Sequence, residues 1–220
     1  MPLKALPVVV AAFDFDGTLT RRDTLMPFLA RGLGWPRFLW VLLRSSPWLL
    51  AYALRLLPND VAKQKLFLRA FKGRALAEMQ AWTDLWLAQD LPGQLQAWTM
   101  ERLAWHQKQG HCCVMVSASP DIYLLAVAEK LGFDGLICTE MAVDAGHLTG
   151  LMSTPNCYGE QKVVRLKSWL ADRFGAEAEA GDLTLHAYGD TAGDWPLLRM
   201  AGQAWYRGRP WRSVAPSPRQ

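Results

Sequence analysis

Three short apolar segments limit the fold of this chain more than any other feature of its sequence. Each lacks polar alternation and is followed at once by small and polar residues: Val8 to Phe13, Cys112 to Val116, and Leu183 to Tyr188. Such runs are typical of strands buried on both faces of a parallel sheet. Each of the turns that follow carries a reactive side chain.

Helical patterns separate these segments. We expect helices at Asn59 to Phe71, with Asn59 as the N-cap, at Arg74 to Gln89, and at Gln94 to Gln109 before Gly110. The alternation of strands and helices predicts an α/β fold on a parallel sheet. A further segment, Thr139 to Met152, alternates around Asp144 to Gly146, which predicts a β-hairpin attached to that sheet.

The chain between the first two strands is far longer than a simple crossover needs and shows almost no strand signal. Seven of the eleven tryptophans fall there, between Trp35 and Trp105. We therefore predict an inserted helical cap over residues 21–99, a catalytic core over 1–20 and 100–212, and a flexible tail over 213–220.

The composition suits a globular protein with a large core. Of the 220 residues, 51% are apolar and 20% are charged, which excludes a disordered chain. The net charge of +4 is too small to predict a nucleic-acid binder. Four cysteines without paired metal-ligand spacing fit reduced core thiols in a cytoplasmic protein: Cys112, Cys113, Cys138 and Cys157.

Two segments resemble membrane signals. Lys4 followed by Ala5 to Phe13 is like the start of a secretory peptide, but the run is short and ends at Asp14, which favours a buried strand. Residues 35–57 are dense in Trp and Leu, yet charged residues break them well below the ~20 apolar residues of a bilayer span. This segment is either core of the cap or an amphipathic surface on lipid headgroups.

Two acidic motifs stand where strands end. Asp14 and Asp16 follow the first strand within Phe13 to Thr18, and Asp190 and Asp194 follow the third. Carboxylates crowded at the edge of a sheet need a compensating cation. Mg²⁺ prefers such oxygen ligands and needs only one or two of these carboxylates.

Two further side chains are suited to hold a phosphoryl group. Ser117 ends the second strand, and Lys162 stands at the start of a helical pattern after Asn156. Ligands of open α/β sheets bind outside the carboxyl ends of the strands, so we expect these residues in one crevice with the acidic motifs.

The four motifs in this order resemble those of the haloacid dehalogenase-like phosphatases. They are DxDGT after a strand, Ser after a strand, a downstream Lys, and GDxxxD after a strand. The helical insertion after the first motif resembles the phosphoserine phosphatase-like branch, and NCxGxxK around Lys162 is similar to subfamily IB. The resemblance implies a Rossmann-like core with an inserted helical cap of the C1 type.

The resemblance also implies roles for individual residues. Asp14 would be the nucleophile that forms an aspartyl-phosphate, and Asp16 the general acid and base. Mg²⁺ would be held by the carboxylates of Asp14 and Asp190 and by the main-chain carbonyl of Asp16. Ser117 and Lys162 would bind phosphoryl oxygens, and Asp194 would orient a metal-bound water or Lys162.

Other interpretations of these residues stay open. The first acidic pair also fits a solvated turn, and Ser117 or Ser119 fits a helix N-cap. Asp23 would contact a substrate amine, as in phosphoserine phosphatases, or begin a helix. Three basic residues of the cap form either a solvated face or a contact in the crevice: Lys63, Lys65 and Arg69. The four histidines have no metal spacing.

The sequence therefore predicts a cytoplasmic Mg²⁺-dependent phosphomonoesterase that acts on a small phosphorylated metabolite, phosphoserine among the candidates. The alternative with the same chemistry is a phospholipid head-group phosphatase, similar to phosphatidylglycerophosphate phosphatases, in peripheral contact with a membrane. The alternative from another class is a catalytically silent basic binding module. A phosphotransferase that uses an alcohol in place of water is a further option.

Overall fold

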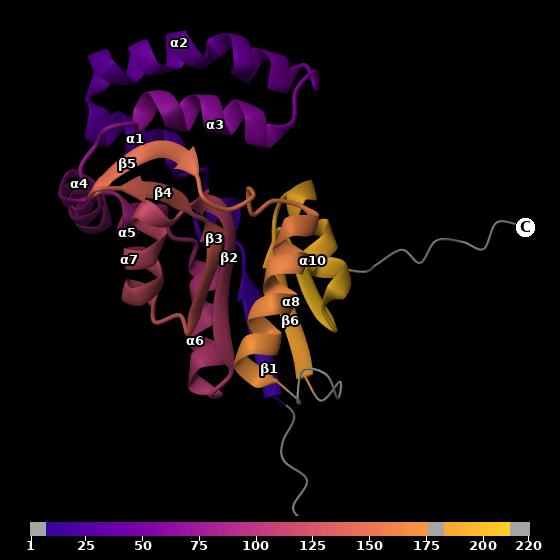
Figure 1. The fold of residues 1–220 in the computed structure, drawn as a ribbon. Coiled ribbons are helices and arrows are strands. Elements are labelled where there is room, and N and C mark those ends of the chain that lie inside the picture. Colours follow the sequence, from indigo (N-terminus) through magenta and orange to yellow (C-terminus); the bar gives the residue numbers. More distant parts are fainter. Residues whose placement is uncertain (1–7, 176–182, 212–220) are drawn as a thin grey trace, which may run out of the picture.

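A mostly parallel six-stranded sheet, in the order β3-β2-β1-β6-β7-β8, runs through the protein (Figure 1). The computed structural model describes residues 8–175 and 183–211, so the predicted tail lies outside it, as do residues 4–7 of the leader-like segment. Only β8 pairs antiparallel among these strands. The α/β prediction is confirmed. The strands are β1 (Val8–Phe13), β2 (Cys112–Pro120), β3 (Gly135–Thr139), β6 (Leu183–Gly189), β7 (Gln203–Tyr206) and β8 (Arg209–Pro210).

The continuous apolar runs are explained by helices on both faces of the sheet. Alternate residues of β1 enter different cores, Phe13 on one face and Ala12 on the other. Helices α6 and α7 cover the first face, and α8 and α10 cover the second. Their bounds are α6 (Ala97–Lys108), α7 (Asp121–Leu131), α8 (Glu160–Phe174) and α10 (Trp195–Met200); two short turns are η1 (Phe15–Leu19) and η2 (Ala192–Asp194).

The chain between β1 and α6 is helical and lies over the end of the sheet (Figure 1). Helices α2 and α3 pack side by side above the remainder of the molecule. The division into core and cap at residues 21 and 99 stays a prediction. The helices of this region are α1 (Leu25–Leu33), α2 (Trp35–Ala53), α3 (Asn59–Ala70), α4 (Leu76–Gln89) and α5 (Leu91–Gln94).

Helix α2 continues through Pro47 without a break. A proline in a helix leaves the carbonyl four residues earlier without its N–H donor. Here the hydroxyl of Ser46 donates to the carbonyl of Leu43 at 2.8 Å and replaces that bond. None of the helices in the described ranges has the length and apolarity that crossing a bilayer requires.

Three predicted helix starts are wrong by one to three residues. In two of them, backbone groups near the predicted start form hydrogen bonds with other segments of the chain. Asn59 is the first residue of α3, and Pro58 is its N-cap. Helix α4 begins at Leu76 because Arg74 and Leu76 bond to the hairpin. Helix α6 begins at Ala97 because the amide of Gln96 donates to the carbonyl of Leu19.

The predicted hairpin forms, but its attachment to the main sheet is wrong. Strands β4 (Met141–Asp144) and β5 (His147–Met152) form a separate two-stranded sheet. This hairpin packs against α3, and the amide of Gly73 donates to the carbonyl of Leu148 at 2.8 Å. The hairpin thus joins the helical region to the chain that leads to α8.

Gly150 permits this close contact between hairpin and helix. Its φ is +79°, and a Cβ there would lie 2.9 Å from the Cα of Leu68. Gly146, in the turn, has a φ of +77° but open space around it.

We expect Gly146→Ala to cost about 1–2 kcal/mol of unfolding free energy, the cost of left-handed backbone alone. Gly150→Ala should cost more, since it adds the clash. Urea unfolding of both variants measures this, and equal costs would contradict the tight contact.

Candidate active site

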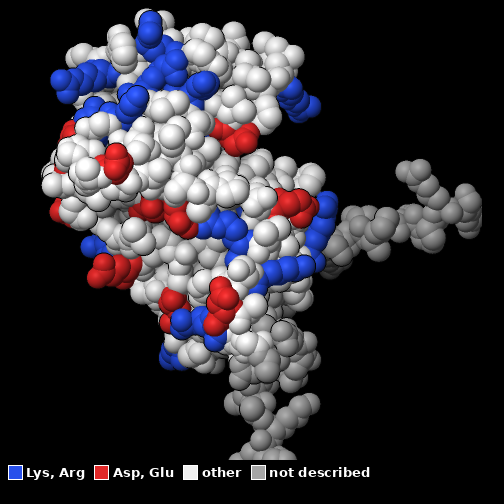
Figure 2. Space-filling view, in the orientation of Figure 1, with Lys and Arg blue, Asp and Glu red and all other residues white. Residues whose placement is uncertain are grey.

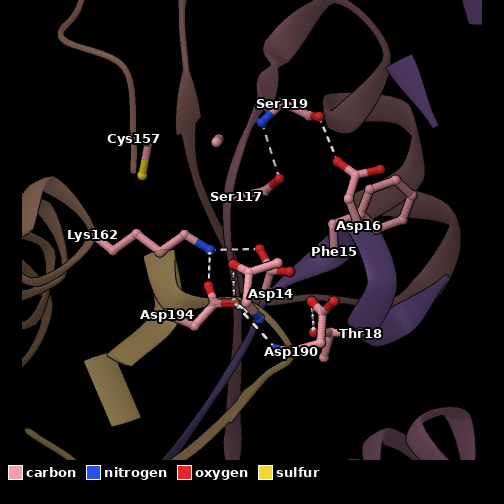
Figure 3. Close-up of polar contacts among 12 residues, drawn as sticks. Asp14, Phe15, Asp16, Thr18, Ser117, Ser119, Cys157, Lys162, Asp190 and Asp194 are labelled. Atoms are coloured by element: carbon pink, nitrogen blue, oxygen red, sulfur yellow. Dashed lines mark hydrogen bonds and ion pairs between the residues drawn. The ribbon is translucent and has the colours of Figure 1, made fainter. Parts of the chain in front are cut away.

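The carboxyl ends of β1, β2 and β6 bring the predicted reactive residues to one edge of the sheet. Phe13 lies opposite Met115 of β2 and Tyr188 of β6. The amide of Asp14 donates to the carbonyl of Tyr188 at 3.0 Å, which extends the register by one residue. Asp14 therefore stands between Ser117 and the turn of the second acidic motif (Figure 3).

A buried lysine links the two acidic motifs. Lys162 Nζ donates to Asp14 Oδ1 at 2.5 Å and to Asp194 Oδ1 at 2.6 Å (Figure 3). Burial alone would lower the pKa of Lys162, but the charges of Asp14 and Asp194 raise it above its usual value. The lysine is therefore a cation that neutralises buried carboxylates.

Asp194 is fully occupied by donors. Its Oδ1 binds Lys162, and its Oδ2 accepts from the amides of Asp190 and Thr191 and from the Thr191 hydroxyl. Burial opposes its ionisation, but Lys162 and these donors hold the pKa of Asp194 below its usual value. Gly189 leaves room for this side chain, since a Cβ there would lie 2.5 Å from that of Asp194. Asp194 thus fixes both the turn and the lysine.

Three carboxylates meet beside the lysine. One oxygen each of Asp14, Asp190 and Asp194 lies within 4.8 Å of the others. Burial and the charge of Asp194 raise the pKa of Asp14 well above its usual value, and the same two causes raise that of Asp190. One ammonium cannot balance three carboxylates, so the donor set fits a hard divalent cation.

Gly17 leaves space for Asp190. Its φ is +79°, and a Cβ at this position would lie 2.2 Å from Asp190 Oδ2. Thr18 donates its hydroxyl to Asp190 Oδ1 at 3.1 Å. The first motif therefore positions the second one across the sheet edge.

The side chain of Asp16 is held apart from that of Asp14. Asp16 Oδ1 accepts from the amide and hydroxyl of Thr24 at 2.7 and 2.6 Å, and Oδ2 accepts from the Ser119 hydroxyl at 2.5 Å. Burial and the charge of Asp23 raise the pKa of Asp16 to about 6. These contacts differ from those of a solvated turn, which was the other interpretation of this motif.

Ser117 and Ser119 do not cap a helix. Strand β2 continues to Pro120, which is the N-cap of α7. Ser117 Oγ accepts from the amide of Ser119 at 3.1 Å, and in the described part of the chain its own hydroxyl donates to no group. Ser117 therefore has a donor to offer to a ligand.

These side chains line a cavity of about 310 Å³ between the sheet edge and the helical region. The helical region contributes an apolar wall and four polar side chains, one of which is that of Asp23. The other lining residues of this region include Leu25, Met26, Leu49, Tyr52, Asn59, Ala62, Lys63 and Leu66; the remaining part includes Asp14, Asp16, Ser117, Ser119, Tyr158, Lys162 and Asp194.

Of the three basic residues considered for the crevice, Lys63 is the one in the cavity wall. Its Nζ donates to the carbonyl of Ala118 at 2.6 Å and to Asn156 Oδ1 at 3.2 Å. Burial lowers the pKa of Lys63 to about 8, although the charges of Asp16 and Asp23 oppose this shift. Lys65 and Arg69 instead stack on Trp48, at 6.0 and 4.5 Å from its ring centre.

Asp23 lies both at the start of α1 and in the cavity wall. Its Oδ1 accepts from the amides of Leu25 and Met26 at 3.1 and 3.4 Å, so it caps the start of α1. It also lines the cavity, which leaves its carboxylate within reach of a ligand.

Sequence reasoning assigned no site role to three residues that hold the site together. Ser119 and Asn156 belong to the motifs around Ser117 and Lys162. Their side chains can form hydrogen bonds, so the sequence could have indicated a role for them. Gln96 gave no such indication: its Nε2 donates to the carbonyls of Gly17 and Thr20 at 2.7 Å, across 79 and 76 residues of chain. Such a contact depends on how α6 packs.

The histidines and cysteines stay outside the site. His106 Nδ1 lies 2.8 Å from His111 Nδ1, and His106 Nε2 lies 2.9 Å from the Tyr188 hydroxyl. Burial and the neighbouring His186 lower the pKa of His106 to about 3, so it packs as a neutral ring. The four cysteines are free thiols, three of them buried and Cys112 half-buried.

The profile of the haloacid dehalogenase-like hydrolases matches residues 11–199. The chain belongs to this family. That membership confirms the resemblance seen in the four motifs, together with the expectation of a hydrolytic enzyme.

Several known sequences and solved structures are similar to this chain. Protein CicA of Caulobacter vibrioides is 34% identical over 90% of this chain and 86% of that protein. A probable phosphatase of Mycobacterium tuberculosis is 28% identical over 88% of this chain and 67% of that protein. The fold is shared with a Bordetella pertussis protein of unknown function (TM-score 0.77, 23% identity, 90% and 88% coverage). It is also shared with a substrate-bound phosphoserine phosphatase (TM-score 0.59, 19% identity, 90% and 84% coverage).

Removal of the buried lysine should destabilise the protein strongly. Lys162→Met leaves Asp14 and Asp194 buried without their cation, and breaking a buried ion pair costs about 3–5 kcal/mol. Lys167→Met, at an exposed position of the same helix, is the matched control and should change stability by less than about 0.5 kcal/mol. Urea unfolding in a chelator measures both, and equal values would show that the ion pairs do not stabilise the fold.

Proposed function

We propose that the protein is a Mg²⁺-dependent phosphomonoesterase that acts through an aspartyl-phosphate. The observation that carries this proposal is the buried Lys162 bound to Asp14 and Asp194, next to Asp190, at the wall of the cavity. Membership of the hydrolase family and the similarity to a probable phosphatase support it.

Asp14 would be the nucleophile. One carboxylate oxygen forms a bond to phosphorus while the bond from phosphorus to the ester oxygen breaks. Lys162, bound to Asp14 Oδ1, orients this carboxylate and would attract a phosphoryl oxygen. The Ser117 hydroxyl would donate to another phosphoryl oxygen.

Asp16 would move the proton. Thr24 and Ser119 hold its carboxyl group on the side of the cavity that faces the helical region. From there it gives a proton to the leaving alcohol and then takes one from the water that attacks phosphorus. That second step breaks the bond between phosphorus and Asp14, which restores the nucleophile and releases phosphate.

The donor set of the site fits Mg²⁺. We expect the carboxylates of Asp14 and Asp190 and the main-chain carbonyl of Asp16 to hold the ion, since Asp194 is already occupied by Lys162 and Thr191. A bound Mg²⁺ supplies positive charge that allows an anionic nucleophile to meet an anionic phosphate ester.

The substrate proposed first is a small phosphorylated metabolite. A cavity of about 310 Å³ accepts a compact molecule. Asp23 and Lys63 place an acid and a base on the wall contributed by residues 21–99, the proposed cap, and this suits a zwitterion such as phosphoserine. We assign the enzyme to the cytoplasm, where its four thiols would stay reduced.

A phospholipid head-group phosphatase is the second candidate. The observation in its favour is a more open groove of about 730 Å³ that shares Tyr52, Asn59 and Tyr158 with the cavity. Leu56, Leu57 and Met152 give this groove an apolar lining that a longer substrate would use. A panel of soluble and lipid phosphates, with phosphate detection, separates the two candidates.

Replacement of either acid of the first motif should abolish turnover or slow it strongly. Hydrolysis of p-nitrophenyl phosphate with Mg²⁺ should disappear in Asp14→Asn, because an amide is not a nucleophile here. Asp16→Asn should lose about 10²–10⁴-fold in kcat, the usual contribution of a general acid and base. Mass spectrometry of a quenched reaction should find the phosphate on Asp14.

The exposed Asp172 of α8 provides the control for this pair. Asp172→Asn should hydrolyse at the wild-type rate. Wild-type activity in Asp14→Asn would discredit the mechanism, whereas absence of hydrolysis in the wild type itself would leave a catalytically silent binding module as the better explanation.

Lys63→Met should weaken substrate binding more than it slows the reaction. A charge-assisted bond contributes about 1.5–3 kcal/mol, so KM should rise at least tenfold at pH 7. In the wild type, KM should rise above about pH 8, because Lys63 then loses the proton that gives it its charge. The variant should show no such rise. Lys65→Met, whose ammonium stacks on Trp48, should keep the wild-type profile.

A further inference from the structure

Helix α2 turns an apolar face to the solvent. Positions spaced by four and three residues lie on one side of a helix. On one side of α2 and its C-terminal extension these positions are Pro36, Trp40, Leu43, Pro47, Leu50 and Leu54, which we call the α2 apolar face. Leu43 is 71% exposed, and Leu50 and Leu54 are each about 60% exposed.

The opposite side of the same helix is also apolar, and this side packs inward. Phe38 and Val41 are buried in the core, where Phe38 is 6% exposed. A helix that needed only to fill the core would carry polar residues on its outer side. Exposed apolar residues that form a continuous face mark an interaction surface, whereas single ones do not.

The charge around this face has one sign. No Asp or Glu occurs between Thr24 and Asn59. Arg37 and Arg44 fall on one flank of the helix, about 100° from the apolar face, and Arg55 follows its C-terminal end. The guanidinium of Arg44 lies 5.7 Å from the ring centre of Trp40. Figure 2 shows Lys and Arg side chains gathered over the α2 and α3 region.

We infer that the α2 apolar face docks onto an anionic lipid bilayer, with the helix parallel to the membrane plane. An apolar face with a basic flank, Trp and Leu included, is the pattern of a helix that lies in the interface. A second copy of this chain fits less well, because an antiparallel symmetric pair of these faces would bring the arginines of both copies together.

Docking would bring the groove to within one helix diameter, about 10 Å, of the lipid surface. The C-terminal half of α2 carries Leu49 and Tyr52, which line the cavity, and Tyr52 and Arg55 line the groove that continues from it. Under the proposed function, phosphorylated molecules at the membrane would then reach the site. This consequence rests on the proposed function, whereas the docking itself does not.

Vesicle sedimentation tests the inference. Full-length protein is centrifuged with vesicles of phosphatidylcholine alone or of phosphatidylcholine with about 30% phosphatidylglycerol. The anionic lipid supplies the negative charge that the basic flank would attract. We expect binding to the anionic vesicles that is at least tenfold stronger and that weakens in salt. The double variant Leu43→Asp/Leu50→Asp should lose at least tenfold in binding. Leu125→Asp, at a 62% exposed position on α7, should bind as the wild type does.

A second variant tests the charges without touching the apolar face. Arg37→Gln/Arg44→Gln should weaken binding by about fivefold for each charge removed. Hydrolysis of soluble p-nitrophenyl phosphate should be the same in the wild type and in both double variants, because none of these side chains lines the cavity. That assay also verifies that the variants are folded.

Three results would overturn the inference. The first is a wild type that stays in the supernatant with anionic vesicles, and the second is equal binding by the wild type and both double variants. The third is a lipid-free dimer, seen by sedimentation velocity, that Leu43→Asp/Leu50→Asp converts to a monomer. Absence of hydrolysis in every protein would contradict the proposed function and would leave the vesicle result unaffected.

Discussion

The arrangement of the site depends on one buried cation. Lys162 joins Asp14, at the end of β1, to Asp194, after β6, through bonds of 2.5 and 2.6 Å. A charge that is buried away from water is stable only beside a partner of opposite charge. The segments that carry Asp14, Lys162 and Asp194 must therefore meet, because each charge buried alone would destabilise the fold. The lysine comes from α8, which follows the hairpin. The same ion pairs therefore align Asp14, the acidic turn and the helix that covers one face of the sheet.

The two sides of the cavity have different physical roles. The sheet edge is rigid, because Asp14 and Ser117 follow strand segments whose register is fixed by hydrogen bonds on both sides. The helical region contributes Asp23 and Lys63, which stand on α1 and α3 or next to them. Under the proposed function, the rigid side performs the reaction and the helical side selects the substrate.

The Trp-rich and Leu-rich segment is divided between the core and the surface. Phe38 and Val41 belong to the core, while Leu43 and Leu50 face the solvent. Helix α2 is apolar on two opposite sides. It packs on only one of them, because its neighbours α1 and α3 lie on that side. The exposed remainder, bordered by arginines, is a surface without a partner in the described structure.

The sequence by itself determined the sheet, the family and the residues at the strand ends. Buried parallel strands have a continuous apolar pattern that is local in sequence, and the motifs that follow them are local as well. Tertiary structure alone decided the partners of those residues. Ser119 meets Asp16, Lys63 meets Asn156, and Gln96 holds the loop after β1, each across 79 or more residues. It also moved the hairpin from the sheet to α3 and chose which side of α2 is buried, because such choices depend on the packing of distant elements and leave no periodic signal in the chain.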